Sequence, residues 1–146
     1  MNAELRATER LVHVPLAGRA YDILIGPGLL ARAGGEITSR LKGRRVAIVT
    51  DENVAPLYLG PLMDGLQTDG IEAVSLTLPA GEKTKSMDHL AAVCDMVLTA
   101  RIERNDAVIA LGGGVIGDLA GFAAGIVRRG VRFVQIPTTL LAQVDS

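Results

Sequence analysis

Four short apolar runs, each followed by a polar or glycine-rich segment and a stretch of helical periodicity, constrain the fold of this chain more than any other feature. The runs cover residues 46–49, 74–78, 107–111 and 132–136. Short, nearly all-apolar runs are typical of parallel strands buried on both faces, and the helices between them supply right-handed crossovers. The sequence therefore predicts an α/β fold, Rossmann-like and doubly wound, with a mostly parallel sheet.

The segment before these runs has a different pattern. Apolar residues alternate at Val12, Val14 and Leu16, and a β-rich run follows at 21–25. This pattern predicts an N-terminal β-hairpin. Helical spacing over 29–41 predicts a first helix after the hairpin, and no linker or low-complexity tract divides the 146 residues. We therefore expect residues 1–146 to form one domain.

The composition excludes several classes of partner. Fifteen Lys and Arg residues stand against 16 Asp and Glu residues, for a net charge of -1. This balance argues against nucleic acid. The apolar runs are too short to span a bilayer, which argues against a membrane partner. The single cysteine, Cys94, excludes an internal disulfide and a cysteine-based zinc cluster, and fits a cytoplasmic location.

The residues that follow the four strands are the candidates for ligand binding. In open parallel sheets, ligands bind beyond the carboxyl ends of the strands. The segments at those ends carry Asp51 and Asn53, Glu82 and Lys85, Gly112 to Gly114 with Asp118, and Thr138 with Thr139. We expect all four segments to gather at one edge of the sheet.

The glycine run at 112–114 predicts a phosphate-binding turn. Glycine lets the backbone approach a pyrophosphate closely, and the helix that follows offers free N–H groups and a positive dipole end. The alternative is that the glycines only make a tight strand-to-helix turn. The run matches neither the GxGxxG pattern nor a P-loop, because no Lys-Ser/Thr follows. ATP chemistry is therefore disfavoured.

Each charged candidate also has a purely structural interpretation. Asp51 could accept hydrogen bonds from an adenosine ribose, which would favour NAD, or it could be an acid at a helix N-terminus. Glu82 and Lys85 could contact one ligand or form a solvated i,i+3 pair. Asp118 could complement the helix dipole as an acid of the first helical turn.

Four segments together resemble one family. They are TDEN at 50–53, LPAGEKTK at 78–85, GGGVIGDLAGFAA at 112–124 and RGVRFVQIPTTLLAQVDS at 129–146. The combination resembles the 3-dehydroquinate synthase family of the sugar-phosphate cyclase superfamily. The resemblance begins near the predicted hairpin and continues to the last residue.

The resemblance implies an enzyme of the shikimate pathway, a phosphate-eliminating lyase that depends on NAD and on zinc or cobalt. Its substrate would be the sugar-acid phosphate 3-deoxy-D-arabino-heptulosonate 7-phosphate, and its product 3-dehydroquinate. A homodimer is also implied. In this family a helical C-terminal domain supplies the metal ligands, and that domain is absent from this chain. We therefore expect the 146 residues to be the NAD-binding N-terminal domain, inactive alone and binding NAD weakly.

The family pattern also implies roles for individual residues. Asp145 matches an active-site carboxylate, and Arg129 matches an arginine that reaches the substrate phosphate across a dimer interface. Without the resemblance, Arg128 and Arg129 would be interpreted as a basic cap at a helix C-terminus. The residues that the family pattern assigns to the cofactor are Asp51, Asn53, Ala80, Gly81, Glu82, Lys83, Thr84, Lys85, Gly113, Gly114, Val115, Ile116, Gly117, Asp118, Thr138 and Thr139.

No residue of the chain is expected to bind metal. His13 and His89 match no ligand of the family, so we expect surface or packing roles for both.

Other functions remain open from the sequence. The nearest are other sugar-phosphate cyclases and the metal-dependent alcohol or glycerol dehydrogenases of related fold, although Val115 and Leu140-Leu141 fit the cyclases better. A different class of function is a stand-alone NAD-binding module without catalysis.

Overall fold

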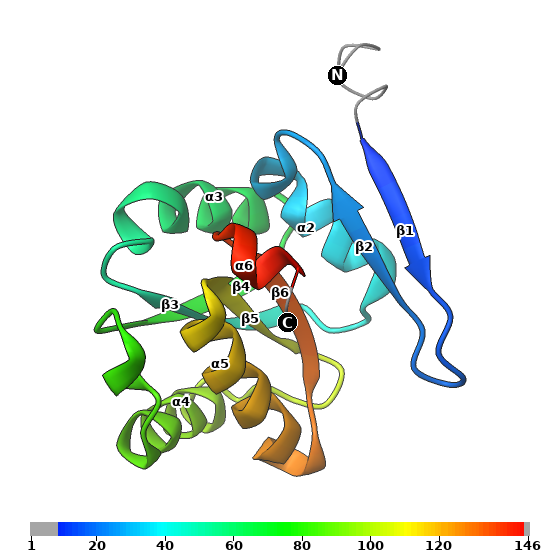
Figure 1. The fold of residues 1–146 in the computed structure, drawn as a ribbon. Helices are drawn as coiled ribbons and strands as arrows, with labels where there is room; N and C mark the ends of the chain where they lie inside the picture. Colours follow the sequence, from blue (N-terminus) through cyan, green and yellow to red (C-terminus); the bar gives the residue numbers. More distant parts are fainter. Residues whose placement is uncertain (1–8, 145–146) are drawn as a thin grey trace.

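The computed structural model describes residues 9–144 and contains two sheets (Figure 1). A two-stranded antiparallel hairpin comes first, with β1 (Arg10–Val14) paired to β2 (Tyr21–Ile25). A four-stranded parallel sheet follows in the order β4-β3-β5-β6. Its strands are β3 (Arg45–Asp51), β4 (Glu72–Leu78), β5 (Ala107–Gly112) and β6 (Arg132–Pro137). The predicted hairpin and the predicted parallel α/β sheet are both confirmed.

Helices join the strands as the periodicity predicts. The α-helices are α2 (Leu29–Arg40), α3 (Gly60–Thr68), α4 (Met87–Thr99), α5 (Gly114–Ile126) and α6 (Leu140–Val144). Shorter turns precede α3, α4 and β6, namely η1 (Ala55–Leu59), η2 (Glu82–Thr84) and η3 (Val127–Arg129). Helix α6 and the three short turns are not predicted from the sequence, because a segment of three to five residues carries too little periodicity.

Two apolar cores lie on opposite faces of the sheet. On one face, α2 and α3 bury Ile37, Leu62 and Leu66 against Ile48 and Ile109. On the other face, α4 and α5 bury a second set against the strands, including Val93, Val97, Val108, Ile116 and Ala120. Strands β3 and β5 are therefore covered on both faces as predicted. Strand β4 is only half-buried along most of its length because it lies at the sheet edge.

The order of the strands reverses between β3 and β5, because β4 lies on one side of this pair and β6 on the other. After β3 the chain leaves toward the α2–α3 face, whereas after β5 it leaves into α5 on the opposite face (Figure 1). Since β3 and β5 are neighbours, the segments after them diverge from adjacent positions. Such a topological switch point is where doubly wound proteins bind ligands.

The α2–α3 contact depends on two glycines. A Cβ at Gly34 would lie 2.7 Å from the Gly65 carbonyl oxygen, and a Cβ at Gly65 would lie 2.9 Å from the Leu30 carbonyl oxygen. The two helix backbones therefore approach each other more closely than any larger residue would allow.

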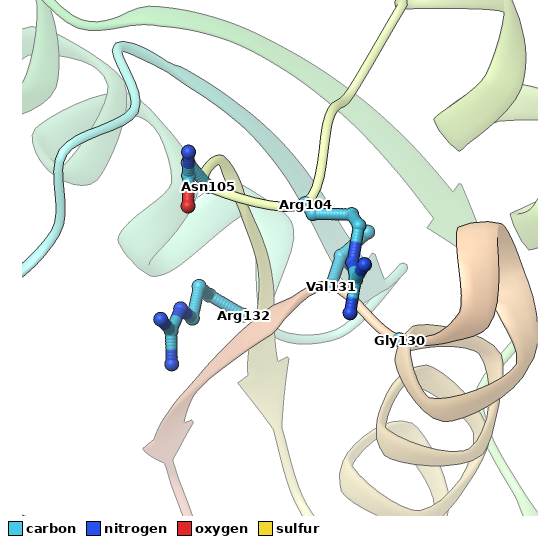
Figure 2. A pocket seen from close by; sticks show the side chains of 5 residues that line it. All are labelled: Arg104, Asn105, Gly130, Val131 and Arg132. Carbon is cyan, nitrogen blue, oxygen red and sulfur yellow. The ribbon is translucent and has the colours of Figure 1, made fainter.

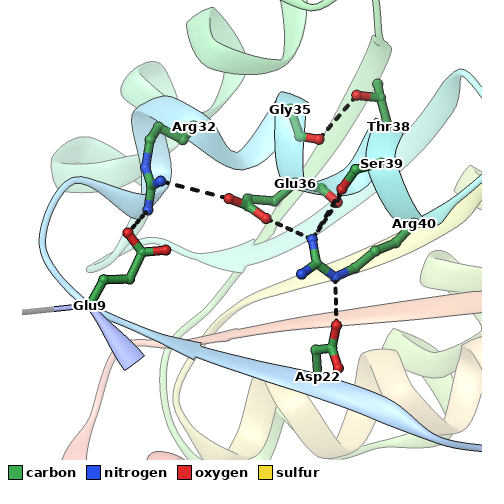
Figure 3. Close-up of polar contacts among 8 residues, drawn as sticks. All are labelled: Glu9, Asp22, Arg32, Gly35, Glu36, Thr38, Ser39 and Arg40. Atoms are coloured by element: carbon green, nitrogen blue, oxygen red, sulfur yellow. Dashed lines mark hydrogen bonds and ion pairs between the residues drawn. The ribbon is translucent and has the colours of Figure 1, made fainter. Parts of the chain in front are cut away.

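Ion pairs tie the hairpin to α2 (Figure 3). Arg40 Nε lies 3.1 Å from Asp22 Oδ2 on β2, and Arg32 Nη2 lies 2.9 Å from Glu9 Oε2 just before β1. Glu36 on α2 lies between the two arginines and pairs with both. One face of the hairpin is therefore held toward α2 by charged side chains.

Candidate functional site

The four segments predicted to bind a ligand begin at the same edge of the sheet. In the strand register, Asp51 is opposite Leu78, Thr50 is opposite Leu111, and Gly112 is opposite Pro137. The strand ends are therefore level, and the expectation that the segments gather at one edge is confirmed. We call the segments 51–54, 79–85, 112–118 and 138–139 the rim.

Contacts between neighbouring segments hold the rim together. The Ala80 amide donates to Glu52 Oε1 at 3.2 Å, and the Glu52 amide donates to the Leu78 carbonyl at 3.0 Å. At the other end of the rim, the Thr138 amide donates to the Gly112 carbonyl at 2.9 Å. Sequence reasoning missed Glu52, although it lies inside the TDEN motif.

The Asp51 carboxylate has a local structural role. Its Oδ1 atom accepts hydrogen bonds from the Asn53 and Val54 amides, both at 2.9 Å, where the chain turns into η1. The carboxylate therefore stabilises the turn between β3 and η1, and it lies ahead of the N-cap of η1, which is Val54. Its second oxygen, Oδ2, accepts no hydrogen bond from residues 9–144. One carboxylate oxygen is therefore left for a ligand.

Thr50, directly before Asp51, is a polar residue that the sequence did not single out. It is fully buried at the switch point, and its Oγ1 has no hydrogen-bond partner within the described part of the chain. A buried hydroxyl without a partner has an energetic cost of about 1–3 kcal/mol. Nothing in the sequence pattern of a strand reveals such an unpaired group.

Lys85 connects two segments of the rim. Its Nζ lies 2.8 Å from Asp118 Oδ2 on α5 and 3.7 Å from Glu82 Oε2. The hydrogen bond to Asp118 raises the pKa of Lys85, and the negative charges of Asp118 and Glu82 act in the same direction. The predicted Glu82–Lys85 pair is present, but Asp118 is the closer partner. The interpretation of Asp118 as a first-turn acid is wrong, since it lies beyond the first turn of α5.

Thr84 supports the 79–85 segment from inside. It is buried, and its hydroxyl donates to the Pro79 carbonyl at 2.5 Å. His89 Nδ1 lies 3.1 Å from both the Thr84 carbonyl oxygen and Ser86 Oγ, and Ser86 caps α4 as predicted. The Thr84 side chain therefore does not face the rim surface, and the packing role expected for His89 is confirmed.

The three glycines before α5 are not equivalent. A Cβ at Gly112 would lie 2.8 Å from Ile116 Cβ, and one at Gly113 would lie 3.3 Å from Thr139 Cγ2. A Cβ at Gly114 would meet no atom within 4 Å. Tight packing therefore explains Gly112 and, in part, Gly113, whereas Gly114 faces open space.

The start of α5 also has free hydrogen-bond donors. No side chain caps this helix, and the Gly117 amide is the first to bond back, to the Gly113 carbonyl. The preceding amides have no partner within the helix, and the positive end of the dipole lies beside them. This terminus is suited to an anion.

Glycines recur along the face of α5 that meets side chains of β6. The Gln135 side chain would be 3.1 Å from a Cβ at Gly117, and the Phe133 ring 3.4 Å from one at Gly121. With Thr139 beside Gly113, the glycine face of α5 follows β6 and the segment after it.

Of the two residues predicted to be catalytic, Arg129 lies away from the rim. Arg129 follows α5 and precedes β6, so it lies at the opposite edge of the sheet from the rim. The 13 residues of α5 separate it from Gly114 by roughly 20 Å at 1.5 Å per residue. Asp145 lies outside the described residues.

Arg128 and Arg129 do not cap α5. Both have left-handed backbones, with φ of 50° and 62°, beyond the last turn of the helix. The interpretation as a helix cap is therefore wrong. Arg128 Nη1 lies 3.6 Å from Glu103 Oε1 instead.

A hollow of about 530 Å³ lies near this second edge, away from the rim (Figure 2). It is lined by Arg104, Asn105, Gly130, Val131 and Arg132. These residues precede β5 and β6, so the hollow is separate from the site predicted at the carboxyl ends of the strands.

Residues 9–144 hold no group of three or more His, Cys, Asp or Glu side chains placed to bind a metal ion. Within the same range, no helix is both long and apolar enough to cross a membrane.

Solved structures of the same fold include two carbocycle synthases that are named for their products. The structure of 2-deoxy-scyllo-inosose synthase matches 93% of this chain and 38% of its own chain, with a TM-score of 0.83 and 24% identity. The structure of 2-epi-5-epi-valiolone synthase from Streptomyces hygroscopicus, with NAD+ and Zn2+ bound, matches 90% of this chain and 36% of its own at a TM-score of 0.75 and 32% identity. The chain therefore has the fold of an α/β domain that makes up 38% and 36% of these two synthases.

Sequence comparisons identify the family within that class. A model described as 3-dehydroquinate synthase N-terminal matches residues 75–146. The 3-dehydroquinate synthase of Agrobacterium fabrum is 83% identical over 144 residues, and that of Rhizobium rhizogenes is 74% identical over 147. These alignments cover 99% and 100% of this chain. The chain belongs to the 3-dehydroquinate synthase family, and it spans 38% and 39% of the lengths of these two relatives.

Proposed function

We propose that this chain is the NAD-binding N-terminal part of a 3-dehydroquinate synthase. The whole enzyme would convert 3-deoxy-D-arabino-heptulosonate 7-phosphate to 3-dehydroquinate and phosphate in the shikimate pathway, as a homodimer. The observation that carries the proposal is the rim, where four separate segments meet at the switch point of the sheet. The identity of 83% to the Agrobacterium fabrum enzyme supports the same activity. We place the enzyme in the cytoplasm, where the unpaired Cys94 would stay reduced.

The residues of the rim fit a dinucleotide. The uncapped start of α5 and the open space at Gly114 suit a pyrophosphate, because the free amides can donate to its oxygens. The free Oδ2 of Asp51 suits the hydroxyls of an adenosine ribose. Lys85, held by Asp118, offers a positive charge beside them.

Other rim residues would mainly shape or line the binding site. Thr84 and Glu52 fix the shape of the 79–85 segment, so Ala80, Gly81 and Lys83 would contact the cofactor through that segment. Asn53, Thr138 and Thr139 would line the same side. Bound NAD would supply reversible oxidation of a ring alcohol, and the protein would orient the ring and exclude water.

Two further residues would contact the substrate. Asp145 would supply a carboxylate. Arg129 would bind the substrate phosphate of the second subunit, since within one copy it lies at the edge opposite the rim. The metal, zinc or cobalt, would be bound by residues that follow this part of the protein, and we derive no step from it.

The alternatives can be weighed. The match to the alcohol dehydrogenase fold is weaker, with 18% identity and a TM-score of 0.65 for butanol dehydrogenase A of Thermotoga maritima. Such a likeness concerns the fold alone. A stand-alone NAD-binding module would be favoured if the natural gene had a stop codon directly after codon 146.

A chimera tests the proposed function. This chain would replace the aligned N-terminal residues of the Agrobacterium fabrum enzyme, and phosphate release from the heptulosonate substrate would be measured with and without NAD. We expect the chimera to keep the activity. The same chimera with Asp51→Ala is the matched variant and should need more NAD. A chimera that is folded and dimeric but inactive would overturn the proposal.

A further inference from the structure

Basic residues gather at the edge of the parallel sheet that lies opposite the rim. Four segments meet there, where the strands begin, and we call the segments 41–45, 69–72, 100–107 and 127–132 the amino edge. Their basic residues are Lys42, Arg44, Arg45, Arg101, Arg104, Arg128, Arg129 and Arg132, and their acidic residues are Asp69, Glu72, Glu103 and Asp106. The amino edge is therefore positive, although the whole chain has a net charge of -1.

Helix dipoles do not account for this excess of positive charge. The negative ends of α3, α4 and α5 lie at the amino edge, and a basic residue in the last turn of a helix is stabilised there. None of these three helices has a basic residue in its last turn. Arg104 and Arg132 come later in the chain, beyond the turn in which the dipole acts.

Most of these positive charges also lack an acidic partner. Within residues 9–144, two basic residues of the amino edge pair with a carboxylate, namely Arg45 with Glu72 and Arg128 with Glu103. Arg104 and Arg132 line the hollow of about 530 Å³ shown in Figure 2. Their side chains make no ion pair or hydrogen bond with any residue of the same range. The hollow is thus lined by two free positive charges.

The turn that carries Arg104 and Asn105 is held from inside the protein. The Asp106 amide donates to the Glu103 carbonyl at 3.0 Å, and the buried Asp106 carboxylate accepts from the Glu103 amide at 2.8 Å. The Gly43 amide donates to the Asn105 carbonyl at 3.0 Å, which ties the turn to the segment before β3. Arg104 and Asn105 therefore project from a fixed backbone.

The other side of the hollow is constrained in the same way. Gly130 has a φ of 104°, and its amide donates to the Val127 carbonyl at 2.8 Å. The Val131 amide donates to the Ala124 carbonyl of α5 at 2.9 Å, and Arg132 follows as the first residue of β6. Because both sides are ordered without a ligand, binding would cost little ordering of the backbone.

We propose that this hollow binds a small molecule that carries a phosphate group. In the strand register Arg132 is opposite Ala107, and Arg104 precedes Ala107 by three residues on the neighbouring segment. Two arginines and the Asn105 amide suit phosphate oxygens, since each guanidinium can donate a pair of parallel hydrogen bonds. The volume of the hollow lies in the range of small-molecule sites, about 300–1,000 Å³. The site goes beyond the proposed function, because neither the rim nor Arg129 lines the hollow.

A nucleic acid is the other phosphate-rich ligand that a basic surface can attract. Proteins that bind single strands present aromatic side chains on which the bases stack. None of the residues that line the hollow is aromatic, and the chain has two Phe, two Tyr and no Trp residues. The lining therefore favours a small phosphate compound over a nucleic acid.

An NMR titration of the chain tests the site, with the amide signals of residues 103–106 and 130–132 as the readout. Glucose 6-phosphate and inorganic phosphate are the probes, glucose is the uncharged comparison, and the ionic strength is kept constant because salt screens exposed charges. We expect both phosphates to shift these signals with a millimolar or lower Kd, and glucose to shift none. A tighter Kd for glucose 6-phosphate assigns the site to a sugar phosphate, and equal values assign it to the free anion.

A matched pair of variants connects binding with the two arginines. The double variant Arg104→Gln with Arg132→Gln should weaken binding by about tenfold or more, since both charged donors are lost. Arg19→Gln removes the same kind of charge from an exposed position in the hairpin turn and should bind as the natural chain does. Thermal unfolding of both variants checks that the fold is kept.

Three results would overturn the proposal. The first is that neither phosphate shifts the signals of the hollow, and the second is that Arg19→Gln weakens binding as much as the double variant. The third is that a short DNA duplex shifts signals along the whole amino edge whereas glucose 6-phosphate shifts none. The amides of Gly114 and Gly117 report on the rim separately, so none of these results would bear on the proposed NAD site.

Discussion

Gly114 offers a direct way to separate the fold of the rim from its function. A Cβ at this position would meet no atom within 4 Å, and the same holds for Gly125 near the other end of α5. Both residues lie in the same helix, so replacement by alanine should not disturb the packing of either. Gly125→Ala is therefore a matched control for Gly114→Ala.

The two variants should differ in binding but not in folding. Alanine in place of a helical glycine stabilises by about 0.5–1 kcal/mol, so Gly125→Ala should raise the melting temperature by a few degrees. Gly114→Ala should raise the melting temperature less, because Gly114 is the first residue of the helix. If a pyrophosphate contacts the backbone at Gly114, the added methyl group would remove one charge-assisted hydrogen bond. That loss is about 1.5–3 kcal/mol, or roughly tenfold to 150-fold in affinity.

The assay is an NMR titration of each variant with NAD, which detects weak binding, together with thermal unfolding followed by circular dichroism. We expect Gly125→Ala to bind NAD as the natural chain does, and Gly114→Ala to bind it much more weakly. Equal NAD affinity in the two variants would refute the assignment of the phosphate site to Gly114, whatever their stability.

Three further predictions concern other parts of the molecule. Asp51→Ala should weaken NAD binding by about 1–3 kcal/mol and lower the free energy of unfolding by about 1 kcal/mol. Asp51→Asn keeps an acceptor for the Asn53 amide, so it should weaken NAD binding but change the stability little. Calorimetry measures the binding and urea unfolding measures the stability. Gly34→Ala should lower the free energy of unfolding by about 1–3 kcal/mol, because its Cβ would lie 2.7 Å from the Gly65 carbonyl oxygen. An unchanged midpoint of urea unfolding would contradict the close α2–α3 contact. Burial raises the pKa of the Cys94 thiol, and the negative charge of Asp95 acts in the same direction. Alkylation of Cys94 at neutral pH should therefore be slower than alkylation of a cysteine in a short peptide, because less of the thiol is ionised. The rate should rise only at a pH above the usual range of thiol pKa values.

The general fold could be predicted because each element carries its own periodicity. The apolar runs place β3 and β5 within two residues of their observed bounds, and glycine or capping residues mark the ends of α2 and α4. The gathering of the rim segments also follows from the sequence, since the carboxyl ends of parallel strands meet at one edge. These predictions need only local pattern and topology.

Contacts between distant residues could not be predicted in this way. Lys85 and Asp118 are 33 positions apart, and their pairing depends on how α5 and the 79–85 segment are placed in space. The glycines at 34 and 65 suggest weak helices from the sequence alone, yet they mark the closest approach of α2 to α3. The left-handed backbones of Arg128 and Arg129 have no sequence signal either, because arginine rarely adopts them.

The glycine face of α5 leaves room for side chains of the neighbouring strand. The Gln135 amide and the Phe133 ring of β6 reach to 3.1 and 3.4 Å from the positions that a Cβ would occupy at Gly117 and Gly121. The helix whose first amides are proposed to hold a phosphate is therefore packed in part by a strand outside its own loop. A larger residue at position 117 would have to push the Gln135 side chain out of this contact.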